Sequence, residues 1–464
     1  MAAHERDAFE RAPPGFADPE GLGDLRSREF GRLDAAGHVY LDYTGAGLYG
    51  ASQVRRHMEL LQRDVLGNPH SESPTARRST ALVEDARRHV LSFFRASADD
   101  YCLIFTGNAS HALKLVGESY PFGPGGRFLL TFDNHNSVNG IREFARSRGA
   151  ETTYLPVVPP DLRVDPDAVL AALGSAGAGG HHLFAYPAQS NFSGVQHDLE
   201  WIAEAQSRGW DVLLDAAAYV PTNRLDLSRW RPDFVVLSFY KMFGYPTGVG
   251  ALFARWPALS KLRRPWFAGG TITVASVGAD QYHPADGAAA FEDGTVNFSS
   301  LPAVDIGLSF LEEVGMDVIH RRVHALTGWL LASLLDLRHA TGLPLVTLYG
   351  PAANERRGAT VALNFRDRSG AFIDHQTIER RAGERNMSIR GGCFCNPGAG
   401  ELAMGISADQ MRACFNSGPD RITYDEFRRC IDTTSSGAVR VSLGVATTFD
   451  DVKAFVEFAR TFLA

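Results

Sequence analysis

Residues 233–254 read DFVVLSFYKMFGYPTGVGALFA, and this stretch decides the fold. Two apolar runs, residues 233–238 and 249–254, flank a loop that carries Lys241. Both runs are continuous rather than alternating, which is typical of strands buried on both faces. The stretch therefore predicts two buried strands with a lysine just beyond the end of the first.

Five similar apolar runs come earlier in the chain, with helix-like stretches between them. They are YCLIFT (101–106), RFLLTF (127–132), TTYLPV (152–157), HLFAY (182–186) and DVLLD (211–215). Alternating strands and helices indicate an α/β fold, in which a mostly parallel sheet is covered on both sides. We expect seven strands in that sheet.

The two ends of the chain have a different character. Residues 1–37 are rich in Gly, Pro, Arg and Asp and predict a loosely packed arm, followed by a large domain over 38–304. Residues 305–464 predict a smaller α+β domain to which the arm contributes. It should begin with a long helix that breaks near Gly315, and its strand candidates are ATVALNF (359–365), MSIRGG (387–392) and AVRVSLG (438–444).

The bulk composition argues against several classes of protein. The formal net charge is −7 and long basic runs are absent, which disfavours nucleic-acid and membrane-surface partners. No apolar run approaches the roughly 20 residues that cross a bilayer, and the start lacks an apolar signal core. Five cysteines in 464 residues argue against a disulfide framework. We therefore expect a cytoplasmic protein.

Polar side chains follow several of the predicted strands. GNASH, DNHNS and PAQSNFSG come directly after three of the runs, while Asp215 and Ser238 end two others. Ligands of open α/β sheets bind along the edge where the strands end. This edge is the predicted ligand site, although surface loops are polar in any fold.

Asp215 and Lys241 suggest the kind of ligand. A carboxylate that closes a buried strand needs a cation or a protonated ring nitrogen as its partner. A desolvated lysine has a lowered pKa and becomes a usable nucleophile. Pyridoxal 5′-phosphate needs both groups: a lysine amine for its aldehyde and a carboxylate for its pyridine nitrogen. A plain ion pair between the two residues is the alternative.

Three other loops offer groups that would complete such a site. Backbone amides near Asn108 and Ala109, with the hydroxyl of Ser110, lie where a strand turns into a helix and could hold a phosphate. His135 could stack on the pyridine ring. Asn191 could donate a hydrogen bond to a ring oxygen or a substrate carboxylate. Each of these residues, taken alone, is equally consistent with a structural role.

Taken together, the motifs resemble the class V aminotransferase-fold enzymes that use pyridoxal phosphate, and in particular the NifS-like cysteine-desulfurase domain of molybdenum cofactor sulfurases. They run in order from about residue 39 to 462: YLDYTGAGLYG, GNPHS, IFTGNASHALKLV, YPAQSNFSGV, LLDAAAYV, LDLS, SFYKMFGYPTGVGAL, FAGGT, AFEDGT, RGGCFCNPGA and GAVRVSLG. The resemblance implies the fold-type-I architecture, pyridoxal phosphate as cofactor, and sulfur removal from L-cysteine or a related thiol amino acid.

The resemblance also implies a role for individual residues. Lys241 matches the lysine that binds the cofactor aldehyde, Asp215 the partner of the ring nitrogen, and His135 the stacking histidine that shuttles protons. Phosphate contacts are implied for Ser110, Ser238 and the amides near Asn108. Thr295 matches a residue that reaches the cofactor of a neighbouring subunit, which implies a homodimer. Carboxylate-binding positions correspond to Asn191, Arg440 and Arg390.

This chain departs from the family pattern at several positions. The residues concerned are Asn108 in place of a glycine, Tyr240 in place of a frequent histidine, Ala218 in place of a glutamine that contacts the cofactor, Gly391 and Gly392 in place of Thr-Gly, and Gly400 in place of a frequent cysteine. The resemblance stops where the desulfurase domain of the sulfurases stops. We therefore expect no carboxyl-terminal module of the MOSC type, and a separate acceptor for the sulfur.

The stretch RGGCFCNPGAGE (390–401) places two thiols one residue apart. A zinc site needs more ligands than this stretch supplies, and a disulfide between Cys393 and Cys395 would be strained. Burial of one thiol for structural reasons remains open. In the family, Cys395 falls on the cysteine that accepts sulfur as a persulfide, and Cys393 on a position that is often histidine. The flanking glycines suggest a mobile loop.

Two other functions fit the same sequence. One is another pyridoxal-phosphate reaction, such as C–S lysis, epimerisation or β-elimination. The other is a non-catalytic sulfur-relay or binding protein, which the pairing of Lys241 with Asp215 disfavours.

Overall fold

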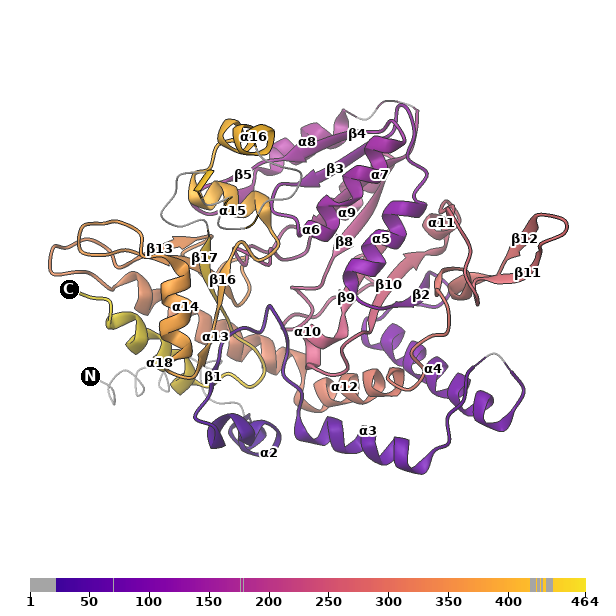
Figure 1. Ribbon diagram of the computed structural model, residues 1–464, viewed down its shortest axis with the longest axis horizontal. Helices are drawn as coiled ribbons and strands as arrows, with labels where there is room; N and C mark the ends of the chain where they lie inside the picture. Colours follow the sequence, from indigo (N-terminus) through magenta and orange to yellow (C-terminus); the bar gives the residue numbers. More distant parts are fainter. Residues whose placement is uncertain are drawn as a thin grey trace.

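The structure is a computed structural model that describes residues 22–464, apart from 70, 176, 178, 418–422, 424–425, 427–428 and 431–436. A seven-stranded sheet forms its centre, with helices on both sides, and a smaller sheet lies beside it in the carboxyl-terminal part (Figure 1).

The central sheet has the strand order β2-β10-β9-β8-β7-β3-β4. All neighbouring strands are parallel, except that β10 runs antiparallel to both β2 and β9. The predicted α/β fold with seven strands is therefore confirmed. Its strands are β2 (Tyr101–Thr106), β3 (Arg127–Thr131), β4 (Glu151–Leu155), β7 (His182–Pro187), β8 (Trp210–Asp215), β9 (Phe234–Ser238) and β10 (Gly250–Arg255).

The antiparallel strand has a simple cause. The link between β9 and β10 contains only the short helix α10 (Phe239–Phe243), and a parallel crossover needs a dozen residues or more. Because β2 and β9 both run against β10, they point the same way as the rest of the sheet. The carboxyl ends of β2, β3, β7, β8 and β9 therefore share one edge.

Each face of the central sheet has its own apolar core. Successive strand residues point to opposite faces, so Leu103 and Phe105 join one buried cluster, while Cys102 and Ile104 join the other. Helices α5 (Ala109–Ser119) and α7 (Ile141–Ser147) cover the second face. The first core includes residues from α4 (Pro74–Phe93), α8 (Pro166–Gly174), α9 (Trp201–Ser207) and α12 (Leu301–Val314).

The carboxyl-terminal part begins with two helices. The predicted break near Gly315 is confirmed, since α12 ends there and α13 (Met316–Leu335) starts. An antiparallel sheet of order β13-β14-β17-β16 follows. Its strands and the helices around them are β13 (Val346–Tyr349), β14 (Thr360–Phe365), β16 (Arg390–Gly392), β17 (Ala438–Ser442), α14 (His375–Gly383), α15 (Pro397–Met404), α16 (Ala408–Ser417) and α18 (Phe449–Arg460).

The predicted strand over 387–392 is divided in two. Its first part, β15 (Met387–Ser388), leaves the small sheet and pairs in parallel with β1 (Val39–Tyr40). Its second part is β16.

The remaining elements are α3 (Ala51–Arg63), α6 (Asn136–Asn139), β5 (Val157–Val158), β6 (Arg163–Val164), α11 (Trp256–Leu259), β11 (Ile272–Ser276), β12 (Gln281–Pro284) and the 3₁₀ helix η1 (Gly287–Phe291).

The described part of the amino-terminal arm is well packed. Helix α2 (Leu22–Ala35) buries Phe30 completely, and Arg26 donates hydrogen bonds to Asp34 and to the carbonyl oxygen of Ala446. The expectation of a loose arm is therefore wrong for residues 22–35, because an apolar stripe on α2 is buried. Residues 1–21 of the arm lie outside the described residues. The division into domains stays a prediction; its boundary at residue 304 falls inside α12.

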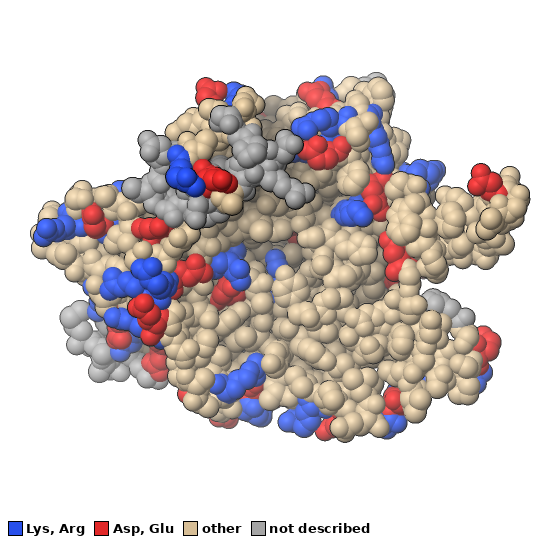
Figure 2. All heavy atoms as spheres, viewed as in Figure 1, with Lys and Arg blue, Asp and Glu red and all other residues tan. Residues whose placement is uncertain are grey.

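The surface carries no extended basic area on the face shown in Figure 2, where blue and red side chains are interspersed. Hairpin β11–β12 projects away from the body of the molecule (Figure 1), and Val277 near its tip is fully exposed. Over the described residues, none of the helices has the length and apolarity that a membrane crossing requires.

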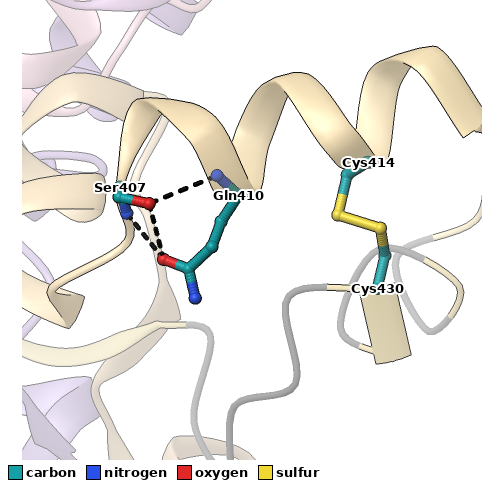
Figure 3. Close-up of a disulfide and its surroundings, with 4 residues drawn as sticks. All are labelled: Ser407, Gln410, Cys414 and Cys430. Atoms are coloured by element: carbon teal, nitrogen blue, oxygen red, sulfur yellow. Dashed lines mark hydrogen bonds between the residues drawn. A yellow bond between two sulfur atoms is a disulfide. The ribbon is translucent and has the colours of Figure 1, made fainter.

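One disulfide joins Cys414 on α16 to Cys430, which is 16 residues further along the chain (Figure 3). The cysteine count did not predict this bond. At the start of the same helix, the side chain of Gln410 accepts a hydrogen bond from the backbone nitrogen of Ser407 at 2.8 Å. Cys102, Cys393 and Cys395 are free thiols.

Candidate active site

A pocket of about 180 Å³ opens at the edge where the central strands end. It brings together residues that follow five different strands, as the sequence predicted. Predicted site residues among its lining are Asn108, Ala109, Ser110, His135, Asn191, Asp215, Ser238 and Lys241.

Lys241 lies on α10, directly after the end of β9, and is partly buried. Desolvation lowers the pKa of its amine, the positive charge of Arg440 lowers it further, and Asp215 opposes the shift. Among the described residues, none accepts a hydrogen bond from this amine. A desolvated amine without a partner inside a pocket is suited to bind a ligand covalently.

Asp215 and His135 face the same pocket from neighbouring strand ends. Asp215 ends β8, is 8% exposed, and accepts a hydrogen bond from the backbone nitrogen of Ala217 at 3.0 Å. His135 caps α6, where its Nδ1 accepts a hydrogen bond from the backbone nitrogen of Ser137. Desolvation lowers the pKa of His135 against the attraction of Asp215, which favours the neutral ring.

The amino end of α5 forms the opposite wall. The Asn108 side chain caps the helix by accepting a hydrogen bond from the backbone nitrogen of His111 at 2.9 Å. Ser238 Oγ accepts one from the Ala109 nitrogen at 2.8 Å, and Ser110 Oγ lies 2.6 Å from Ser137 Oγ. Backbone amides and hydroxyls at a helix amino end favour an anion. The wall is tight, because a Cβ at Gly250 would lie 2.6 Å from the Asn108 backbone.

Arg440 and Arg390 do not line the pocket; they lie side by side on paired strands and share one carboxylate. Arg440 Nη2 lies 3.0 Å from Asp42 Oδ1, and Arg390 Nη2 lies 2.6 Å from Asp42 Oδ2. Arg440 is 2% exposed and also donates to the carbonyl oxygen of Asn191 at 3.1 Å. Sequence analysis placed both arginines in the site but missed Asp42, whose only signal was its place in the motif YLDYTG.

We expect Asp42→Asn to lower the free energy of unfolding by about 3 kcal/mol, because the buried Arg440 charge would lose its counter-ion. Chemical denaturation of the wild type and the variant would measure this loss. Asp409→Asn is the matched control, since Asp409 forms an ion pair with Arg412 that is exposed to solvent, and it should leave stability unchanged. Equal stability of the Asp42 and Asp409 variants would contradict the shared counter-ion.

The loop that carries the two thiols is tied to the pocket. The carbonyl oxygen of Cys395 accepts a hydrogen bond from the Asn136 nitrogen at 2.7 Å, next to His135. Asn191 Nδ2 donates to the Phe394 carbonyl oxygen at 2.7 Å, and Asn396 Nδ2 donates to Asn191 Oδ1 at 2.9 Å. The polar atoms of Asn191 therefore hold the thiol loop. The flanking glycines suggested a mobile loop, and any movement of this loop must first break these hydrogen bonds.

Both thiols are exposed, although the ring between them is buried. Neighbouring protein atoms still partly desolvate the Cys393 thiol, which raises its pKa. The described residues contain no group of three or more side chains suited to hold a metal ion, so a zinc site at this pair has no further ligands there.

Thr295 lies away from the pocket of its own chain. It is exposed and accepts a hydrogen bond from Asn68 Nδ2 at 3.4 Å. It lines a second pocket of about 240 Å³ together with Thr106 and Gly107, at the end of β2. Its predicted action on a neighbouring subunit stays a prediction.

Gln189 is a pocket residue that sequence analysis missed. It lines the pocket, is 2% exposed, and donates from Nε2 to the Ala218 carbonyl oxygen at 3.0 Å. Ala218 is the position at which the resemblance implies a lost glutamine contact, and Gln189 places an amide beside it. Tyr240 also lines the pocket, where burial raises the pKa of its hydroxyl.

These groups fit one kind of ligand. The unpartnered amine of Lys241 suits a carbonyl, the buried Asp215 carboxylate suits a cationic ring nitrogen, and the amino end of α5 suits an anion. A flat heteroaromatic aldehyde with a phosphate group has all three features, and pyridoxal 5′-phosphate is such a molecule.

Comparison with known proteins gives concordant matches. The aminotransferase class-V family model matches residues 39–455. Molybdenum cofactor sulfurase of Bos taurus is 37% identical, over 94% of this chain and 51% of its own length. Molybdenum cofactor sulfurase of Homo sapiens is 39% identical, over 95% of this chain and 51% of its own length. The chain thus spans about half the length of these curated relatives.

Solved structures agree on the fold. A cysteine desulfurase from Thermococcus onnurineus superposes with a TM-score of 0.78 at 21% identity, covering 95% of this chain and 98% of its own. The cystine C–S lyase C-DES, in complex with its product cysteine persulfide, superposes with a TM-score of 0.70 at 16% identity. The match covers 94% of this chain and 100% of that structure's chain.

Proposed function

The chain belongs to the aminotransferase class-V family, and on that premise we propose that it is a pyridoxal-phosphate-dependent cysteine desulfurase. It takes sulfur from L-cysteine onto Cys395 and releases L-alanine. The observation that carries the proposal is the bond from the Asn136 nitrogen to the Cys395 carbonyl oxygen, which holds an exposed thiol beside the pocket of Lys241, Asp215 and His135.

Each wall of the pocket has a part in holding the cofactor. Lys241 would bind its aldehyde carbon, Asp215 would hold the proton on its ring nitrogen, and His135 would stack on the ring. The amides of α5, with Ser110 and Ser238, would bind the phosphate, and Gln189 would offer an amide near Ala218. When bound, pyridoxal phosphate supplies an electron sink that lets bonds at the α- and β-carbons of an amino acid break.

The residues of the chain then divide the chemistry. Arg440 would bind the substrate carboxylate by exchanging its pairing with Asp42 for the substrate. The lowered pKa of Lys241 lets its free amine take the α-proton. The Cys395 thiolate attacks the sulfur of the substrate, so that an S–S bond forms as the Cβ–S bond breaks. Cβ gains a proton and Lys241 returns a proton to the α-carbon, which gives L-alanine and a Cys395 persulfide. The two sulfurs together lose two electrons and Cβ gains two, so no outside oxidant or reductant is needed.

The final sulfur acceptor follows from the relatives by analogy. Two of them are named molybdenum cofactor sulfurases, so the molybdenum cofactor is the first acceptor to test. A separate acceptor protein or a small molecule of a specialised pathway is the second. The exposed Cys395 thiol gives any of these acceptors direct access.

A homodimer is part of the proposal. Thr295 is exposed on the rim of the second pocket, outside the pocket that holds Lys241. From there it would contact the phosphate group of the cofactor bound to a neighbouring subunit. Sedimentation of the purified protein, with Thr295→Ala tested for cofactor retention, would examine this point.

The product with L-cysteine decides between the proposed reaction and its rival. A desulfurase yields L-alanine and a persulfide, whereas an eliminating C–S lyase yields pyruvate, ammonia and hydrogen sulfide. We expect alanine in equal amount to the sulfur transferred. Pyruvate as the main product would overturn the desulfurase assignment, and a protein without cofactor absorption would point to a non-catalytic role.

We expect Arg440→Ala to raise KM for L-cysteine and to lower kcat/KM by a factor that corresponds to about 2–4 kcal/mol, the loss of a buried charge-assisted pair. Steady-state kinetics would measure this change, with cofactor content as the check that the pocket is intact. Arg366→Ala is the matched control, since Arg366 directly follows β14 of the same small sheet and donates a hydrogen bond to Thr347 Oγ1 on β13. An unchanged kcat/KM for the Arg440 variant would remove this arginine from the site.

A further inference from the structure

Phe394 separates the two thiols in sequence, and its ring is the buried part of their loop. It is 8% exposed, while Cys393 and Cys395 on either side are exposed. Phe394 and Cys395 both have a φ of 56°, a left-handed conformation that costs free energy in residues other than glycine. Such a conformation persists only where surrounding contacts hold it, and here the packing of the ring adds to the hydrogen bonds that Asn191 and Asn136 donate to the loop.

Those contacts lead to the predicted substrate-binding arginine. The guanidinium carbon of Arg440 lies 4.7 Å from the centroid of the Phe394 ring, and the Phe192 ring packs against the same ring at 5.3 Å between centroids. A cation over an aromatic face is attracted by the ring, and more strongly when it is desolvated. Arg440 is 2% exposed, so this attraction acts out of reach of water.

We propose that Phe394 is the positioning residue that couples the carboxylate on Arg440 to the placement of the Cys395 thiol. This inference rests on the proposed function, in which Cys395 accepts the sulfur. With no substrate, Arg440 is paired with Asp42 and lies over the Phe394 ring, which keeps the loop docked. A substrate carboxylate competes with Asp42 for the guanidinium, draws the guanidinium off the ring, and frees the adjacent thiol to move towards the substrate.

The test uses the alkylation of Cys395 by iodoacetamide in the holoenzyme, in a Cys393→Ser background so that one thiol of the peptide 391–412 reacts. L-Alanine is the probe, because it has the amino and carboxylate groups of the substrate but no sulfur. We expect saturating L-alanine to raise the alkylation rate of Cys395 by about tenfold, on the scale of losing a desolvated cation–π contact. If the alkylation rate of Cys395 is the same with and without L-alanine, the proposed coupling is overturned, regardless of the results for the variants.

Variants separate the charge effect from simple packing. Phe394→Leu fills much of the same volume without an aromatic face, so Cys395 should react fast with or without L-alanine. Its kcat should fall about tenfold while KM stays near the wild-type value. Phe394→Tyr should restore both readouts. Phe192→Leu is the control, since it loosens the same cluster but leaves the ring under Arg440, and it should keep the L-alanine response.

The outcomes are distinguishable from failure of the proposed function. Alkylation requires no turnover, so an L-alanine response that disappears in Phe394→Leu supports the coupling even if the products are those of a lyase. A Phe394→Leu enzyme with wild-type kcat and a wild-type L-alanine response overturns this inference and leaves the desulfurase proposal standing.

Discussion

Lys241→Ala is expected to abolish turnover of L-cysteine, with kcat reduced by at least about 10⁴-fold, because the same amine binds the cofactor and moves the α-proton. The chain has only four lysines, and Lys241 is the one that lines the pocket. Borohydride treatment of the wild-type holoenzyme should therefore fix the cofactor on Lys241, and peptide mapping would locate it.

Lys114→Ala is the matched control. Lys114 is exposed on α5, 3.5 Å from Glu118, and belongs to the helix whose amino end lines the pocket. Its loss should leave both the cofactor absorption and kcat unchanged. Borohydride label on Lys114, Lys261 or Lys453, or residual turnover near the wild-type rate in Lys241→Ala, would show that the cofactor site has been assigned to the wrong lysine.

Cys395→Ser should be the second variant with complete loss of activity, yet it should keep its cofactor. The pocket walls come from α5, α10 and the residues that end or follow β3, β7, β8 and β9, and the Cys395 side chain is not among the groups that line it. The variant should therefore bind pyridoxal phosphate and L-cysteine with wild-type absorption changes, while alanine release falls below detection. Amino-acid analysis measures the alanine, and mass spectrometry of peptide 391–412 measures the added sulfur.

Cys393→Ser is the matched control for this prediction, since its thiol lies two residues away in the same exposed loop. Partial desolvation by neighbouring protein atoms raises the pKa of the Cys393 thiol although the residue as a whole is exposed, and this disfavours its thiolate, so its loss should change alanine release only mildly. Persulfide mapped to Cys393, or full alanine production by Cys395→Ser, would reverse the assignment within the pair. If neither variant matters, the eliminating lyase becomes the better account.

The central sheet and the pocket were predictable because they depend on local sequence. Continuous apolar runs mark strands buried on both faces, and residues at the ends of parallel strands must meet at one edge. Lys241, Asp215 and His135 were placed together in this way. The resemblance then assigned their roles, and the structure brings them into one pocket.

What escaped prediction depends on contacts between distant segments. The carboxylate of Asp42 meets Arg440 only because β1 pairs with β15 and residue 42 bridges to Ser442. Helix α2 looked like a loose arm because its partners are distant in sequence: Phe30 packs against Phe310 on α12, and Arg26 donates to the carbonyl oxygen of Ala446 before α18. Nothing in the local pattern of residues 22–35 reveals those partners.

The pairing between residues 39–44 and the last strands also constrains how the protein is made. Thr44 donates a backbone hydrogen bond to Ser442 Oγ, and Leu41 donates one to the Ser388 carbonyl oxygen. During synthesis the central sheet, which ends at residue 255, can form while the remainder is still being translated. The contact of Asp42 with Arg390 and Arg440 cannot form until Ser442 has left the ribosome. A nascent chain can therefore complete the strands whose ends carry Asp215 and Lys241 long before Arg440 can meet Asp42, so these two parts of the molecule are joined only at the end of synthesis.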